Sequence, residues 1–416
     1  MVSFSRGALR GEIVVPGDKS ISHRALILSA HDSEPLHITN LNPGRDVLAT
    51  RTALQEIALR QAQGDTGGDR SIDCMNSGST ARMLLGVCAG ANIRARFDGD
   101  ASLRRRPMEP VAAQLRAFGA RIETTEGHLP LEIRGRERVE TRSFILLSPS
   151  AQVKSALLFA ALFAGVAIDI TGDAGSRDHT ERLLHFQGAS IQWDGSRIAL
   201  SAPPTRRDPI EIAGDFSAAA FFITAASISP GSEVLVRDVG VNPTRTGLLD
   251  ALRGMGADIE LRNERERSGE PIADIAVRHA PLHGIVVDDA LALRAVDEIP
   301  LLAVAAAFAQ GGTTINGIAD LRTKESDRIA AIEQLLAAVG IEAQALPRGL
   351  AIQGGKPKAI GAIVASHGDH RIAMAAAVLA TAAGPLAVDD AESVDVSFPE
   401  FLATLERARA GGRATP

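Results

Sequence analysis

The sequence predicts an α/β protein with two similar domains, because the chain is too long for one core and repeats one helix–strand pattern. It has 416 residues, more than a single hydrophobic core usually serves. Apolar residues make up 45% and charged residues 23% of the chain. That composition is typical of a globular protein and excludes a disordered or fibrous one.

Six short stretches are rich in small residues and apolar on nearly every side. A helix of that kind belongs inside a domain and not on its surface. The six are Lys19–Ala30, Ser79–Gly90, Ala151–Gly165, Phe216–Ser227, Glu298–Gln310 and His370–Ala383.

A second pattern alternates with the first and consists of an amphipathic helix, a Gly-containing turn and a strand. Its copies are Gly44–Arg60, Arg106–Glu123, Arg177–Gln192, Asn242–Glu260, Lys324–Gln344 and Ser397–Ala410. In the clearest copies a Gly stands before the strand, as expected for a left-handed residue just after a helix. The alternation predicts six βα-type units, three to a domain, joined near Ala213–Ser217. The alternative is a set of unrelated helices in an ordinary α/β enzyme.

Charge and cysteine content predict a cytoplasmic protein that binds neither nucleic acid nor membrane. The net charge of −6 gives no basic field for nucleic acid. Cys74 and Cys88 are the only cysteines, which favours a reducing compartment. The segment Met1–Glu12 lacks the apolar stretch of a secretion signal, and the longest apolar run, Ala156–Ile168, is too short to span a bilayer.

The candidate binding residues stand at the starts of the buried helices. A helix N-terminus carries unpaired N–H groups and about half a positive charge, so it suits an anion. Within PGDKSISHR, Lys19 lies at this end while Ser20 and Arg24 share one face. The alternative, a cap on a solvated surface, conflicts with the apolar run that follows. Asp215 and Ser148 are interpreted as ordinary N-caps.

Three further motifs place polar groups at helix starts. KESDR puts Lys324 and Arg328 one turn apart, with an exposed salt-bridged turn as the alternative. DHR puts Arg371 at the start of an apolar helix, where a buried guanidinium needs either Asp369 or an anionic ligand as its partner. NSGST supplies Gly78 for a close backbone approach to a ligand, with an ordinary turn as the alternative.

No metal site and no nucleotide cofactor are expected. The His and Cys residues lack zinc-like spacing, and no dinucleotide or nucleophile-elbow fingerprint is found. A Walker-type phosphate loop fails because Asp18 precedes Lys19 where that loop requires Gly.

Nine motifs, taken in order, resemble those of the 3-phosphoshikimate 1-carboxyvinyltransferases, a family of enolpyruvyl transferases. They are PGDKSISHRALIL, NSGSTARMLLG, RRRPM, SPSAQVKSALL, SRDHTERLL, DEIPLLAVAAAFAQGGTTI, LRTKESDRI, DHRIAMA and SFPEF, from about Pro16 to Phe401. The resemblance implies two similar domains, each of three βαβαββ units in an inside-out α/β barrel, which close on the substrates. It places residues 1–17 and 215–416 in one domain and residues 18–214 in the other.

The resemblance also implies the substrates, phosphoenolpyruvate and shikimate 3-phosphate, and a monomer that needs no cofactor. The positions that match the family's shikimate 3-phosphate contacts are Lys19, Ser20, Arg24, Ser150, Gln152, Arg177, Asp297 and Lys324. Those that match its phosphoenolpyruvate contacts are Lys19, Gly78, Arg106, Gln152, Arg328 and Arg371. The implied catalytic groups are Asp297 as the base and Glu325 or Lys19 as the proton donor to the methylene carbon.

The sequence departs from the family pattern at several points, and two other functions compete. Ala151 stands where one branch has a second Ser, Val396 where another has Lys, and Asp320 where an amide is common. The related UDP-N-acetylglucosamine carboxyvinyltransferases usually carry a reactive Cys in the loop that matches Ala101–Met108, and this loop has none. A non-catalytic repeat module that binds anionic partners is the rival of another class.

Overall fold

The computed structural model describes residues 2–32, 34–62, 71–135, 138–172, 175–361 and 363–415. Within these ranges the chain forms two compact units. Unit 1 comprises residues 1–18, 213–266 and 271–416, and unit 2 comprises residues 19–212 with the short segment 267–270. Each unit has its own hydrophobic core. No helix in the described part of the chain is long and apolar enough to cross a membrane.

Unit 2 contains seven helices in its described residues. They are α1 (Lys19–Ser29), α2 (Arg45–Ala62), α3 (Gly78–Gly90), α4 (Ala101–Arg104), α5 (Glu109–Phe118), α6 (Ala151–Ala164) and α7 (His179–Phe186). Its strands are β3 (Ile38–Thr39), β4 (Ser71–Asp73), β5 (Ala95–Asp98), β6 (Arg121–Thr125), β7 (His128–Arg134), β8 (Ser143–Ile145), β9 (Ile168–Thr171), β10 (Ser190–Trp193), β11 (Arg197–Ala202) and β12 (Ile210–Glu211).

Unit 1 contains the helices α8 (Phe216–Ile228), α9 (Gly247–Gly254), α10 (Asp289–Arg294), α11 (Ile299–Ala307), α12 (Arg328–Ala337), α13 (His370–Ala383) and α14 (Phe401–Arg409), with the 3₁₀ helices η1 (Ala319–Thr323) and η2 (Ala391–Val396). Its strands are β1 (Val2–Phe4), β2 (Arg10–Val14), β13 (Glu233–Gly240), β14 (Asp258–Arg267), β15 (Glu270–Arg278), β16 (Val286–Val287), β17 (Gly312–Ile315), β18 (Ala343–Leu346), β19 (Gly349–Gln353), β20 (Ile363–Val364) and β21 (Leu386–Val388).

One sheet pattern recurs in both units. In the sheet β4-β5-β7-β6, the first pair of strands is parallel and the other pairs are antiparallel. The sheets β8-β9-β11-β10 and β16-β17-β19-β18 repeat this arrangement. In chain order the elements β4, α3, β5, α5, β6 and β7 form one βαβαββ unit, apart from the short α4. The predicted α/β class and its repeating unit are therefore confirmed.

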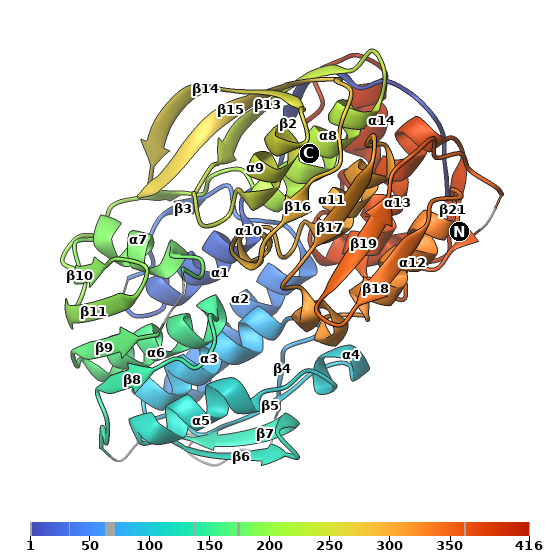
Figure 1. Cartoon of the computed structure of the whole chain (residues 1–416). Coiled ribbons are helices and arrows are strands. Elements are labelled where there is room, and N and C mark those ends of the chain that lie inside the picture. The colour runs from blue at the N-terminus through green and yellow to red at the C-terminus, as the bar shows by residue number, and fades with distance from the viewer. Residues whose placement is uncertain are drawn as a thin grey trace. The chain divides into compact units, whose positions relative to one another are not determined.

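The six apolar stretches all fold as helices within a few residues of their predicted bounds. In unit 1 the helices α8, α11 and α13 pack against one another in the core (Figure 1). Every residue of α8 and of α13 is buried. In unit 2 the closest pairing is between α3 and α6, where Gly86 and Gly90 of α3 face the backbone of α6 so closely that a Cβ would clash.

The Gly residues that separate each outer helix from its strand have the predicted left-handed conformation. Gly119, Gly188, Gly256 and Gly340 have φ values of 121°, 81°, 94° and 73°. The helix start predicted at Lys324 was wrong. The stretch Lys324–Gln344 begins its helix only at Arg328, because the Asp327 side chain accepts hydrogen bonds from the N–H groups of Ile329 and Ala330 and so caps α12 there.

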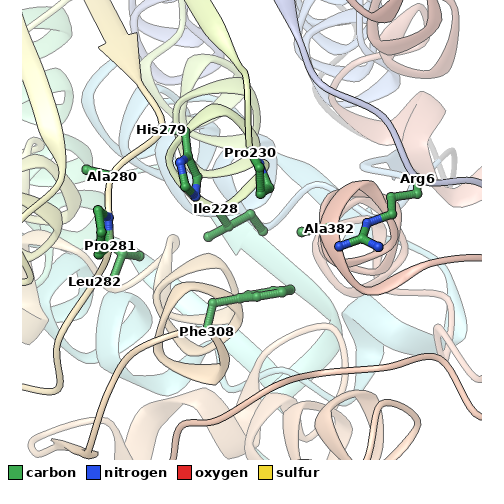
Figure 2. Close-up of a pocket in the computed structure, with 9 residues that line it drawn as sticks. All are labelled: Arg6, Ile228, Pro230, His279, Ala280, Pro281, Leu282, Phe308 and Ala382. Carbon is green, nitrogen blue, oxygen red and sulfur yellow. The ribbon is translucent and has the colours of Figure 1, made fainter.

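A pocket of about 170 Å³ lies in unit 1 at the C-terminal ends of its inner helices (Figure 2). Ile228 ends α8, Phe308 follows α11, and Ala382 lies near the end of α13. Arg6 and His279 also line this pocket. Of the predicted site residues, Asp297 and Arg371 lie at the opposite, N-terminal ends of α11 and α13, and Lys324, Glu325 and Arg328 lie at the start of α12. None of them lines the pocket, which is therefore not part of the candidate site.

Candidate active site

The thirteen predicted site residues are divided between the two units, and in each unit they gather at helix N-termini. Unit 2 holds Lys19, Ser20, Arg24, Gly78, Arg106, Ser150, Gln152 and Arg177. Unit 1 holds Asp297, Lys324, Glu325, Arg328 and Arg371. We call each of these two sets a cluster and describe the two clusters separately.

In unit 2, Lys19 begins α1 and its Nζ lies 2.8 Å from Oδ2 of Asp46 on α2. Asp46 is also tied to the start of α3, because its backbone oxygen accepts a hydrogen bond from the Thr80 hydroxyl. The same hydroxyl bonds to Ser77, the N-cap of α3, at 2.7 Å. A chain of side chains therefore connects Lys19 with the turn that carries Gly78.

Arg24 is buried, and its guanidinium joins three helices. It donates to Thr180 of α7 at 2.7 Å, to Ser155 of α6 at 2.9 Å and to the backbone oxygen of Ser20 at 2.8 Å. The predicted shared face of Ser20 and Arg24 is confirmed. A solvated surface is excluded for Arg24, because only 4% of the residue is exposed.

The start of α3 meets the start of α6 through Gln152. The amide of Gln152 donates to the Ser79 hydroxyl at 3.0 Å and accepts from Arg82 at 2.7 Å. Arg106 donates to the Asn76 side chain at 2.5 Å, on the turn that precedes Gly78. A Cβ added to Gly78 would lie 2.6 Å from Nη1 of Arg82 and 3.4 Å from Nη1 of Arg106. Gly78 therefore lies next to two guanidinium groups, those of Arg82 and Arg106.

Ser150 and Arg177 complete the unit 2 set. Ser150 is the N-cap of α6 and accepts from the N–H of Val153. Arg177 is half-buried ahead of α7, next to Ser176, whose backbone oxygen accepts from Lys154 at 3.2 Å. Of the two residues predicted to be structural N-caps, one is confirmed and one is wrong. Asp215 caps α8 as expected, whereas α6 is capped by Ser150 and not by Ser148.

In unit 1, Arg328 is almost completely buried at the start of α12 and faces two carboxylates. Its Nε lies 2.7 Å from Asp369, and its Nη2 lies 2.5 Å from Glu325. Burial opposes the charge of Arg328, but Asp369, Glu325 and Asp297 outweigh it and raise the pKa of the guanidinium. The exposed salt-bridged turn considered for KESDR is therefore wrong. Lys324 lies just before this start and is half-buried.

Arg371 does not form the ion pair with the Asp369 side chain that we considered. Only its backbone N–H binds Asp369, at 2.9 Å, because Asp369 is the N-cap of α13 and its carboxylate is engaged by Arg328. The Arg371 guanidinium turns instead to α8 and α11. Its Nη1 donates to the Ser217 hydroxyl at 2.5 Å and to the backbone oxygen of Asp297 at 2.9 Å.

Asp297, the candidate base, is 20% exposed and lies among three arginines. Its carboxylate oxygens are 3.7 Å from Arg371, 3.8 Å from Arg328 and 3.9 Å from Arg245. Three cations at this range favour the charged, proton-accepting form of a carboxylate. The cluster in unit 1 therefore holds a partly exposed carboxylate among three guanidinium groups.

Sequence reasoning missed three residues that the structure brings into these clusters. They are Arg82 and Asp46 in unit 2 and Arg245 in unit 1. A signal existed for Arg82, which stands on the apolar helix α3 and needs a polar partner there. For Arg245 the signal was its place near the start of the copy Asn242–Glu260, since the copies at Arg106 and Arg177 also begin with an Arg that was assigned to the site.

Comparison with known proteins identifies the family. The family model described as EPSP synthase (3-phosphoshikimate 1-carboxyvinyltransferase) matches residues 5–405. The chain belongs to this family. Among its relatives, the 3-phosphoshikimate 1-carboxyvinyltransferase of Alkalilimnicola ehrlichii is 43% identical, over 98% of this chain and 97% of that protein. The 3-phosphoshikimate 1-carboxyvinyltransferase of Desulforudis audaxviator is 45% identical, over 98% of this chain and 99% of that protein.

A solved structure agrees with this assignment. The EPSP synthase of Acinetobacter baumannii superposes with a TM-score of 0.83 and 36% identity, covering 98% of this chain and 97% of the other. The match extends over both units, so the whole enolpyruvyl transferase fold is shared. The family predicted from the nine motifs is confirmed.

Proposed function

We propose that this protein transfers the carboxyvinyl group of phosphoenolpyruvate to the 5-hydroxyl of shikimate 3-phosphate and releases phosphate. Membership of the EPSP synthase family carries this proposal. The two clusters support it, because phosphoenolpyruvate and shikimate 3-phosphate each carry about three negative charges near neutral pH. The seven cations at helix starts suit such ligands: Lys19, Arg24, Arg106, Arg177, Lys324, Arg328 and Arg371.

We propose for these residues the binding roles that the resemblance to the family implies. Ser20, Arg24, Ser150, Gln152 and Arg177 hold shikimate 3-phosphate, with Arg177 at its phosphate. Gly78, Arg106, Arg328 and Arg371 hold phosphoenolpyruvate, and Lys19 and Gln152 contact both. Asp297 and Lys324 lie at the shikimate hydroxyls. Arg24 and Arg328 are already engaged by protein groups, so they contribute a fixed positive charge and need little reorganisation when an anion binds.

The reaction proceeds by addition and elimination. The oxygen of the 5-hydroxyl bonds to C2 of phosphoenolpyruvate while Asp297 accepts the hydroxyl proton. Glu325 or Lys19 gives a proton to C3. The product is a tetrahedral ketal phosphate. Loss of a proton from the new methyl group then breaks the C2–O bond to phosphate and restores the vinyl group. The arginines stabilise the charge that develops on the leaving phosphate.

A coupled assay of phosphate release tests this function. The purified protein is given phosphoenolpyruvate with shikimate 3-phosphate, and each substrate is omitted in turn as the control. We expect phosphate only when both are present, together with the enolpyruvyl product by mass spectrometry. Release with UDP-N-acetylglucosamine as acceptor would assign the related activity, and no release with either acceptor would favour a binding module. We further propose that the protein is monomeric and cytoplasmic.

Replacing Gly78 with Ala is expected to weaken inhibition by glyphosate. Glyphosate is slightly longer than phosphoenolpyruvate and would occupy the same cationic pocket. The added methyl group would lie 2.6 Å from Nη1 at the flexible end of Arg82, which would have to shift. Overpacking the tight contact with a bound inhibitor costs about 1–3 kcal/mol. Inhibition should therefore weaken about 5–150-fold, with a smaller rise in the KM of phosphoenolpyruvate.

Paired inhibition curves, competed against phosphoenolpyruvate, measure this effect. Gly254→Ala serves as the control, because a Cβ there has its nearest neighbour at 4.0 Å. Equal inhibition constants for the wild type and Gly78→Ala would remove Gly78 from the pocket.

A further inference from the structure

Arg245 and Glu298 form a buried ion pair beside the candidate base. Their side chains are 4% and 0% exposed. Both terminal nitrogens of Arg245 donate to the Glu298 carboxylate, with Nη2 at 3.0 Å from Oε1. The guanidinium also lies over the Phe216 ring, 5.7 Å from its centre. A two-point contact of this kind fixes the position of both groups.

The pair extends to Arg371 through a hydroxyl. Ser217 donates to Oε1 of Glu298 at 2.6 Å and accepts from Nη1 of Arg371 at 2.5 Å. Nη1 of Arg371 is also 3.4 Å from the same carboxylate oxygen. Nη1 of Arg371 therefore contacts both Ser217 and Glu298. The other nitrogen, Nη2, faces Asp297 at 3.7 Å.

We infer that Arg245 and Glu298 are positioning residues for the transfer reaction: they hold Arg371 and set the charge around Asp297. This inference rests on the proposed function. Because Arg245 neutralises Glu298, the carboxylate can orient Arg371 through Ser217 without cancelling its charge toward an anionic substrate. Because Glu298 neutralises Arg245 in turn, Arg245 is kept from closing the 3.9 Å gap to Asp297.

The pair is favourably placed for this role because its charges are fixed. Burial opposes ionisation of Arg245, but Glu298, Asp297 and Asp215 outweigh burial and raise the pKa of the guanidinium. Arg245 therefore stays charged at every pH at which the reaction can be measured. Removing either member of the pair changes the charge near Asp297 by one unit. It leaves the buried partner with only a longer ion contact, from Glu298 to Arg371 at 3.4 Å or from Arg245 to Asp297 at 3.9 Å.

Charged groups on the elements that pack against α11 remain in place in the test. They are Asp215 at α8, Glu325 and Arg328 at α12, Asp369 and Arg371 at α13, and Lys324 before α12. The helix α9 also packs against α11, and its charged residues, Asp250 and Arg253, are exposed. Since none of them is altered, a shift in the pH profile reports the change in the pair.

The test is the pH dependence of kcat/KM for four proteins: wild type, Arg245→Met, Glu298→Gln and the double variant. Loss of the Arg245 cation should move the acid limb upward by about one pH unit, since a nearby opposite charge lowers a carboxyl pKa by about 1–3 units. Glu298→Gln should move it downward by a similar amount, because a negative neighbour is lost. The double variant removes both charges and should return the limb close to that of wild type.

A second readout separates positioning from general damage to the fold. With Glu298 no longer neutralised, Arg245→Met should raise the KM of phosphoenolpyruvate by about tenfold, the effect of losing one charge-assisted contact. The KM of shikimate 3-phosphate should stay within about twofold of wild type. Arg245→Lys keeps the charge and should restore the acid limb. Arg294→Met, which breaks a half-exposed pair with Asp250 in the same unit, is the matched control.

The outcomes distinguish this inference from the function on which it rests. A wild-type protein that releases no phosphate would overturn both. An active wild type whose acid limb stays in place in both single variants would overturn the positioning role alone, even if turnover falls. If Arg245→Met does not fold, Glu298→Gln and the double variant still decide, because a downward shift in the first that is reversed in the second requires a charge effect.

Discussion

Asp297→Asn is expected to keep the fold and to lower kcat by about 10²–10⁴-fold, the usual contribution of a general base. Asn has nearly the same shape as Asp but cannot accept the proton of the attacking hydroxyl. The three guanidinium groups 3.7–3.9 Å away lose one counter-charge in the variant, yet each keeps a further partner. The measurement is single-turnover phosphate release, with circular dichroism to confirm folding.

The control for this variant is Asp289→Asn in the same unit. Asp289 pairs with Arg348 at the surface, where the two side chains are 59% and 74% exposed. Its loss should leave kcat unchanged. If Asp297→Asn retains activity within about threefold of wild type, Asp297 is not the general base of the reaction.

Lys154→Met should cause the largest loss of stability, about 3–5 kcal/mol. Nζ of Lys154 lies 2.8 Å from Glu181, and the two side chains are 1% and 0% exposed. The variant leaves a buried carboxylate without its cation. Trp193, the single Trp of the chain, lies on β10 of the same unit. Its fluorescence during urea unfolding therefore reports the stability of unit 2.

The double variant Lys154→Met/Glu181→Leu separates this charge effect from packing. It should recover most of the loss, because a buried ion pair can often be replaced by apolar groups at little cost. Arg197→Met breaks a pair at the surface of unit 2, with Asp169, and should cost less than about 1 kcal/mol. If Lys154→Met loses no more stability than Arg197→Met, the Lys154–Glu181 pair contributes nothing to the stability of unit 2.

The stability difference between Lys154→Met and the double variant Lys154→Met/Glu181→Leu should also depend on pH. Burial raises the pKa of Glu181 above its ordinary value of 4.5, and Lys154 opposes that shift. In Lys154→Met the opposition is gone, so the folded state keeps the Glu181 proton at a pH where the unfolded state has released it. Stability then falls as pH rises through this range. The deficit relative to the double variant should be small near pH 4 and larger near pH 7.

The repeating architecture and the family could both be predicted from the amino-acid sequence. The inner helices could be located within a few residues, because a helix that is apolar on all sides is stable only when buried. The left-handed Gly positions could be located because few other residues adopt that conformation without strain. The nine motifs identified the family because their order and residue types are specific, even though no single one is decisive.

The partners of the buried charged groups could not be predicted from the sequence and were found in the three-dimensional structure. Asp369 and Arg371 are neighbours in the sequence, but residues two apart on a helix point to different sides. Asp369 therefore pairs with Arg328, and Arg371 reaches Ser217 and Glu298 on two other helices. A charged residue within an apolar stretch of the sequence predicts that the side chain is buried and needs a partner. Which partner it finds depends on how α8, α11, α12 and α13 pack, and that packing brings together residues from distant parts of the chain.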